Sequence, residues 1–393
     1  MAWNWPWKRE PDRAGARISE AKSTPGFIAL HQQGEAQWPR RDYAGLAREG
    51  FMRNAVVYRC AKLICESAAS LPWLLYQGEE EVTEHPVLSL IGRPNPRQSG
   101  EAMMETVYGH LLIGGSAYVE MTDGGQDARE LHVLRPDRVS VLADGSGWPV
   151  AVDYRTGTTK RRIALGAEPG PGALQLTLFH PLDDHYGFAP LEAASMALGI
   201  QNAAQHWNKA LLDNSARPSG ALVYAPKDGG NMPDDQYDRL KAELEERFSG
   251  PSRAGRPMLL EGDLDWKAMS LTPKDMDFAE ARNGAARDIA LAFGVPPMLL
   301  GIPGDNTYAN YAEANRAFWR LTVMPLVGRI AGEFSHFLSA KFGEDLRLRH
   351  DADAVDGLSL DREALWRRVN AADFLTEDEK RQAVGYGPKT SAS

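Results

Sequence analysis

Hydrophobic residues recur at the three-to-four-residue spacing of a helix between Val57 and Ala68. The dipeptide Leu71-Pro72 follows this run, and a proline cannot continue a helix. The pattern therefore predicts a helix that leads into an extended segment ending near Tyr76.

Several later segments show the same helical spacing. A helix that opens with Pro190 in its first turn is typical of a proline-capped start. Pro325 lies inside the longest segment and is predicted to kink it. The segments are residues 85–96, where a short helix ends in a turn, and 100–114, 190–214, 275–293 and 309–342.

Short β-prone runs separated by glycine, aspartate and proline fill residues 117–181. Such runs predict one antiparallel layer of strands beside the helices, and hence an α+β fold. One further strand is expected at Leu346–His350. The runs are Tyr118–Met121, Val139–Leu142, Val150–Tyr154 and Leu174–Phe179.

A small strand–helix–strand module is expected between the helices at 190–214 and 275–293. Its strands are Gly220–Tyr224 and Pro257–Leu260, and its helix is Pro233–Phe248. Because two helices flank it, the module is expected at the end of a two-helix stalk.

The two ends of the chain have different characters. Residues 1–25 combine three tryptophans with charged and small residues in no regular period, which predicts a mobile arm. A docking contact and loose surface packing are both open explanations for its tryptophans. Residues 359–388 predict a small helical tail, in which Thr376 and Glu379 fit a capping box.

Composition and charge restrict the function. The chain has 393 residues and a net charge of -9, the wrong sign for a protein that grips nucleic acid by neutralising phosphates. No run is apolar enough to cross a bilayer or to act as a secretory signal, so a soluble protein without a membrane partner is expected. Cys60 and Cys65 have no second Cys/His pair and are expected to be reduced, buried thiols.

Motifs for catalysis are lacking. The sequence contains no GxxxxGK[ST] loop, no HExxH and no GxSxG, so neither an enzyme activity nor a cofactor is expected. The cluster His180, Asp183, Asp184 and His185 is compatible with metal binding or acid–base chemistry. A polar turn in which Asp or His caps backbone amides is the commoner arrangement for such residues.

Five stretches in a fixed order carry a family resemblance. The most specific is the last, with a helix, a Val-Pro break and a Thr-Tyr-x-Asn loop before a long helix. Together they resemble the portal protein family of tailed bacteriophages, of the siphophage or alphaproteobacterial gene transfer agent type. One departure is Gly115-Ser116, which stands where many members have a single Asn after one Gly. The stretches are VVYRCAKLICESAASLPWLLY (56–76), HPVLSLIGRPNP (85–96), HLLIGGSAYVE (110–120), YGFAPLEAA (186–194) and IALAFGVPPMLLGIPGDNTYANYAEANRAFW (289–319).

The resemblance implies a portal-type subunit with an α+β wing, a two-helix stem, a small αβ clip and a helical crown. The implied parts are a flexible arm (1–25), the wing (26–189 and 312–358), the stem (190–216 and 275–293), the clip (217–274), a tunnel loop (294–311), and the crown with the C-terminal tail (359–393).

The implied function is structural. About twelve copies would form a ring at one capsid vertex, through which double-stranded DNA passes without sequence specificity during packaging and release. The implied partners are the major capsid protein, the head-tail adaptor and the terminase large subunit. The implied location is the portal vertex of a virion or phage-like particle, with assembly in the host cytoplasm. A DNA-processing or motor-associated enzyme of the packaging apparatus is the alternative, but it would need a nucleotide or metal motif.

Two groups of residues are candidate sites under this resemblance. The tunnel loop would line the channel, and because it has no Lys or Arg it would offer no cationic clamp to phosphates. A plain surface turn with a helix cap is the other explanation for this loop. The channel candidates are Gly304, Asp305, Asn306, Thr307, Tyr308, Asn310 and Tyr311, and the adaptor-binding candidates in the clip are Tyr224, Tyr237, Leu240, Leu244 and Phe248.

Overall fold

The computed structural model describes residues 42–78, 80–123, 129–166, 170–213, 220–224, 238, 264–268, 278–302 and 308–386. The chain divides into two compact units. The smaller comprises residues 1–34 and 209–276, and the larger comprises residues 35–208 and 277–393. The predicted arm, residues 1–25, lies outside the described residues.

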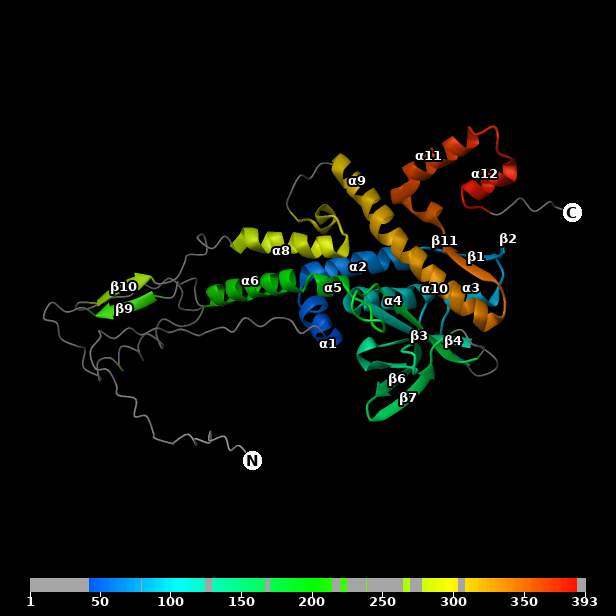
Figure 1. Cartoon of the computed structure of the whole chain (residues 1–393). Helices are drawn as coiled ribbons and strands as arrows, with labels where there is room; N and C mark the ends of the chain where they lie inside the picture. The colour runs from blue at the N-terminus through cyan, green and yellow to red at the C-terminus, as the bar shows by residue number, and fades with distance from the viewer. Residues whose placement is uncertain are drawn as a thin grey trace, which may run out of the picture. The chain divides into compact units, whose positions relative to one another are not determined.

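The core of the larger unit forms where α2 (Ala55–Ala69) packs against α4 (Gly100–Gly114) (Figure 1). The predicted helical stripe is confirmed, because Val57, Ala61 and Ile64 are fully buried. Cys60 and Cys65 are buried in the same helix, as expected, and burial raises the pKa of each thiol to about 12. Ahead of α2 lie α1 (Tyr43–Leu46) and a π-helical turn at Ala47–Phe51.

The strands of the larger unit form three small antiparallel sheets instead of the single layer predicted. The sheet orders are β11-β1-β2, β4-β3-β8 and β5-β6-β7. Three strands, β2, β4 and β7, lay outside the predicted runs. β2 has only two residues, and β4 and β7 each have several charged residues where an alternating pattern would have apolar ones. The bounds are β1 (Trp73–Gln77), β2 (Glu80–Glu81), β3 (Ser116–Asp123), β4 (Arg129–Leu134), β5 (Val139–Ala143), β6 (Pro149–Thr156), β7 (Thr159–Ala164), β8 (Gly172–Thr177) and β11 (Leu346–His350).

The helices predicted within 85–96, 190–214 and 275–293 are present with small changes of boundary. The predicted helix at 190–214 is divided at Ala194 into α5 (Pro190–Ala193) and α6 (Ser195–Asp213). The helices α3 (Pro86–Gly92) and α8 (Phe278–Phe293) lie within the expected segments.

The long segment predicted at 309–342 is interrupted before its proline. It comprises α9 (Tyr308–Phe318), a π-helical turn at Trp319–Val323, and α10 (Met324–Phe342). Pro325 lies in the first turn of α10, directly after that π-helical turn. The irregularity is therefore the π-helical turn that leads into the proline.

The end of the chain forms α11 (Ser359–Asn370) and α12 (Glu377–Ala383). The predicted capping box is confirmed. The amide of Glu379 donates to Thr376 Oγ1 at 3.3 Å, and the amide of Thr376 donates to Glu379 Oε2 at 2.7 Å.

In the smaller unit, β9 (Gly220–Tyr224) has the predicted bounds. Its antiparallel partner is β10 (Leu264–Ala268), a strand that the sequence pattern did not predict. The predicted strand at 257–260 lies outside the described residues, as does the predicted helix at 233–248 except for Asp238, which is helical. None of the helices in the described ranges combines the length and apolar character needed to cross a membrane.

Candidate functional site

A polar cluster ties the start of α6 to the start of α2. Asn54 caps α2, because its Oδ1 accepts hydrogen bonds of 3.1 Å from two amides of the first helical turn. Its Nδ2 donates to Gln201 Oε1 at 2.8 Å and to Asn202 Oδ1 at 2.9 Å. Asn202 also donates to the carbonyl oxygen of Glu49 at 2.9 Å. These hydrogen bonds of Asn54, Gln201 and Asn202 hold α6 in position against the start of α2.

The C-terminal end of α8 is also held in place. Ile289 and Phe293 are buried in the core, and the helix ends at Gly294, whose φ of 68° is in the left-handed region. Thr322 Oγ1, from the π-helical turn before α10, donates to the carbonyl oxygen of Gly294 at 2.6 Å. Both predicted stalk helices therefore have one end anchored in the larger unit.

The predicted tunnel loop is described only at its two sides. Pro297–Leu300 form a 3₁₀ turn that ends at Gly301, where φ is 70°. Tyr308 begins α9, and both Asn310 and Tyr311 are exposed on its first turns, with Tyr311 at 50% exposure. The candidates Gly304, Asp305, Asn306 and Thr307 lie outside the described residues.

The predicted clip residues are also only partly described. Tyr224 is the last residue of β9 and lies opposite Leu264 of β10. The candidates Tyr237, Leu240, Leu244 and Phe248 lie outside the described residues, so their expected common helical face stays a prediction.

The cluster at 180–185 forms the capping turn that was expected. Asp183 Oδ1 accepts hydrogen bonds from the amides of His185 at 2.8 Å and Tyr186 at 3.0 Å, and His180 Nδ1 accepts one from Leu182 at 3.1 Å. Burial opposes ionisation of Asp183, but these two amides hold its pKa below the usual value. Within the described residues, no group of three or more His, Cys, Asp and Glu side chains is placed to hold a metal ion.

A close backbone contact holds this turn against the end of α4. Gly115 has a φ of 72°, and a Cβ added to it would lie 2.2 Å from the carbonyl oxygen of Gly187. The amide of Gly187 donates to Ser116 Oγ at 2.9 Å. Only glycine fits at position 115, because the backbone of Gly187 passes so close to it. This contact and the hydrogen bond to Ser116 give a physical reason for Gly115-Ser116, where the sequence departs from the family pattern.

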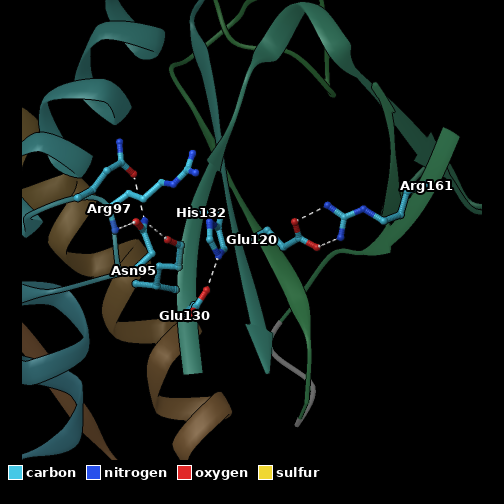
Figure 2. A network of polar contacts seen from close by, with 8 residues as sticks. Asn95, Arg97, Glu120, Glu130, His132 and Arg161 are labelled. Atoms are coloured by element: carbon cyan, nitrogen blue, oxygen red, sulfur yellow. Dashed lines mark hydrogen bonds and ion pairs between the residues drawn. The ribbon is translucent and has the colours of Figure 1, made fainter. Parts of the chain in front are cut away.

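The sequence did not predict two polar contacts, one between two sheets and one between a helix turn and a sheet (Figure 2). Glu120 of β3 is 5% exposed, and Arg161 of β7 binds it with both guanidinium nitrogens, Nη2 lying 2.7 Å from Oε2. Buried Asn95 donates to the carbonyl oxygen of Leu131 at 3.0 Å, which attaches the turn after α3 to β4. Partners so far apart in the chain leave no local sequence signal.

Comparison with known proteins agrees with this architecture. The family model described as phage portal protein matches residues 55–385. A chain from the neck of an empty gene transfer agent (GTA) particle, computed with C6 symmetry, is 48% identical with a TM-score of 0.69, covering 90% of this chain and 96% of that chain. A chain from the neck of the native GTA particle, computed with C12 symmetry, is 47% identical with a TM-score of 0.66, covering 90% and 97%. An uncharacterised protein of Rickettsia felis is 41% identical over 343 residues, covering 86% of this chain and 88% of that protein. The protein described here belongs to the phage portal protein family.

Proposed function

We propose that this chain is the structural subunit of a portal ring of about twelve copies, which forms the channel for double-stranded DNA at one vertex of a phage-like capsid. The observation that carries the proposal is the family match over residues 55–385. The two GTA necks, described with C6 and C12 symmetry, support a ring and the portal vertex as its location.

The anchored helices support a rigid stem. A channel wall must keep its diameter while DNA moves through it. The hydrogen bonds from Asn54 to α6 and from Thr322 to the end of α8 fix the two proposed stem helices, residues 190–216 and 275–293, at their roots.

The charge of the chain is consistent with a conduit. Each phosphate neutralised by Lys or Arg adds affinity that depends on salt, and such affinity would slow DNA in transit. The chain has a net charge of -9, and its proposed tunnel loop, residues 294–311, contains Asp305 but no Lys or Arg.

Electron microscopy of the purified protein tests the ring. Rings with a central hole are the expected result. Uniform monomers that hydrolyse ATP would overturn the proposal and favour an enzyme of the packaging apparatus.

We place the clip, residues 217–274, on the outward side, where it would bind the head-tail adaptor and the terminase large subunit. The β9–β10 ribbon, whose strands lie between the two stem helices in the sequence, supports this role. Deletion of residues 226–256 is expected to leave rings that no longer capture adaptor or terminase in a pull-down. Normal capture by rings of the deletion variant would move the docking site elsewhere.

We assign the crown, residues 359–393, to the inside of the head. Truncation after Asp356 is expected to spare ring formation and contact with the major capsid protein but to impair DNA retention. Loss of rings on truncation would instead place α11 or α12 in the contact between subunits.

We assign the narrowest part of the channel to residues 301–311. Asp305→Lys combined with Asn306→Arg would place about 24 cations around a twelve-fold channel, so packaging should stall in a salt-dependent way. The measurement is packaging rate against ionic strength, with ring formation checked first. A double variant that packages at the wild-type rate in low salt would show that this loop does not contact DNA.

A further inference from the structure

The loop at residues 178–187 is held rigidly by its own chain. The amide of Leu178 donates to the carbonyl oxygen of Gly115 at 2.8 Å, and Gln175 Nε2 donates to the carbonyl oxygen of His185 at 2.6 Å. Asp183 caps two amides within the loop. A segment held in this way loses little further conformational entropy when a partner binds it.

The tip of this rigid loop is apolar and exposed. Phe179 is 77% exposed and Leu182 is 93% exposed. Large apolar side chains on a flexible loop could turn inward, but the capped backbone keeps these two in solvent. The loop thus presents two anchor residues of the kind that protein interfaces bury.

Acidic side chains lie within this loop and line a cavity beside it. A cavity of about 390 Å³ lies beside the loop and is lined by Asp137, Asp183 and Glu192, among others. Arg135 pairs with Asp137 at 2.7 Å, which leaves Asp183, Glu192 and the exposed Asp184 as the negative groups. This surface, Phe179 to Tyr186 with Glu192, is called the acidic loop below.

The acidic loop covers one edge of the sheet β5-β6-β7. Tyr186 supplies the contact, since its hydroxyl oxygen accepts a hydrogen bond of 3.0 Å from the amide of Val141 in β5. Because β5 pairs with β6 on its other side, this amide belongs to the edge of the sheet.

The opposite edge of the same sheet is basic. In the described part of the chain β7 pairs only with β6, and it carries Lys160, Arg161 and Arg162, all more than half exposed. Their carboxylate partners, Asp153 and Glu120, are buried beneath them. Exposed Arg155 lies beside Lys160 in the strand register. Because successive residues of a strand point to opposite faces, Arg155, Lys160 and Arg162 lie on the face of Asp153, and Arg161 lies on the face toward Glu120. The basic edge therefore has three cations on one face and one on the other, over two buried carboxylates.

Closed rings are built from heterologous contacts, in which two different surfaces of the same chain meet. One sheet of this chain carries an acidic surface with apolar anchors at one edge and a basic surface at the other. We propose, resting on the ring proposed above, that the acidic loop of one copy docks on the basic edge, Arg155 with Lys160 to Arg162, of the next copy. Complementary charge would set the direction of the contact, and Phe179 and Leu182 would be buried in it.

The test uses exposed residues, so that folding is preserved. The variants are Leu182→Ser, Asp184→Lys, Arg155→Glu and the double charge swap Asp184→Lys with Arg155→Glu. Each single variant is expected to raise the protein concentration needed for half-assembly by about tenfold, and the charge swap is expected to recover most of that loss. The effect of each charge variant should shrink at high salt. Mass photometry of the full chain across a concentration series measures the fraction in rings.

Two matched controls lie elsewhere on the larger unit. Phe374 is 86% exposed between α11 and α12, and Arg368 is exposed on α11. Phe374→Ser and Arg368→Glu repeat the same chemical changes away from the sheet and should assemble as wild type does.

The outcomes separate this inference from the proposed function. If wild type and all variants form rings equally well, the contact between subunits lies elsewhere on the chain, and the proposed ring is still supported. If single variants fail and the charge swap does not recover, the two surfaces do not face each other. Irregular aggregation of Arg155→Glu would mean that Arg155 on β6 and the cations of the neighbouring edge strand β7 only protect that strand from pairing. A wild type that stays monomeric at every concentration would overturn the ring and this interface together.

Discussion

The side-chain amide of Asn54 donates a hydrogen bond of 2.8 Å to Gln201 Oε1, although 147 positions separate the two residues in the chain. Both residues are buried, at 1% and 3% exposure. One asparagine therefore caps the central helix α2 and fixes the direction in which α6 leaves the core. The geometry of a proposed stem helix depends on this residue.

Asn54→Ala should lower the free energy of unfolding by about 3 kcal/mol, because it removes a helix cap and leaves Gln201 with a buried, unsatisfied oxygen. Urea unfolding measures the change. Ser99→Ala is the matched control, since Ser99 caps α4 through a single bond of 3.2 Å to the amide of Ala102 in an exposed position. The control should cost about 1 kcal/mol. Equal losses would mean that the bonds to α6 contribute nothing.

Among the residues described, Ser99 bonds only to its own helix, whereas Asn54 also bonds to a distant one, and only the first kind of contact can be predicted from the sequence. A cap acts within three residues, so helices such as α2 and α4 and the Thr376 capping box were predictable from local pattern. Strand partners and contacts between sheets were not. β7 carries charged residues because ion pairs such as Arg161 with Glu120 replace the apolar contacts of an ordinary alternating strand.

The functional features divide in the same way into those that a local sequence pattern predicts and those that depend on contacts between distant residues. The family was recognised from five ordered stretches, and the expected capping turn at Asp183 is present. The acidic loop was not recognised as a surface, because exposure of Phe179 and Leu182 depends on how Gly115 and Gly187 cross. A glycine in a sequence does not reveal which backbone approaches it.

Gly115→Ala should destabilise the protein by more than about 3 kcal/mol, because a Cβ would meet the carbonyl oxygen of Gly187 and the backbone would have to move. Gly147→Ala is the control. Gly147 also has a positive φ, 88°, but nothing lies within 4 Å of its added Cβ, so about 1 kcal/mol is expected. Thermal unfolding of both variants separates the destabilisation caused by the close contact with Gly187 from the destabilisation caused by the positive φ alone. A similar loss in both would mean that the close approach can relax.

Arg161→Met should destabilise the larger unit by about 3 kcal/mol, because it leaves the Glu120 carboxylate buried without its cation. The double variant Glu120→Met with Arg161→Met should recover most of that loss, since a hydrophobic pair can replace a buried ion pair. Urea unfolding of the two single variants and the double variant gives the coupling energy. Additive losses would contradict a direct interaction between these side chains.

Two partly buried histidines, His110 and His350, should make stability depend on pH. Burial lowers the pKa of His110 to about 4 and that of His350 to about 4. In the unfolded chain both would titrate near 6.5. Between pH 6.5 and pH 4 the unfolded state therefore binds protons that the folded state does not bind. The contribution of these two histidines to the free energy of unfolding should be fully present above pH 6.5 and should be lost as the pH falls toward 4. The loss is at most about 3 kcal/mol per histidine.

His350→Phe tests the origin of this pH dependence. Phenylalanine keeps a ring against Trp73, whose ring centroid lies 3.9 Å from that of His350, and it cannot take up a proton. The free energy of unfolding, measured by urea between pH 7 and pH 4, should fall less steeply with acid in this variant than in wild type. His336 is exposed on α10, so His336→Gln should leave the slope unchanged. A wild-type slope in His350→Phe would show that His350 is protonated in the folded protein, and would assign the acid sensitivity to other groups.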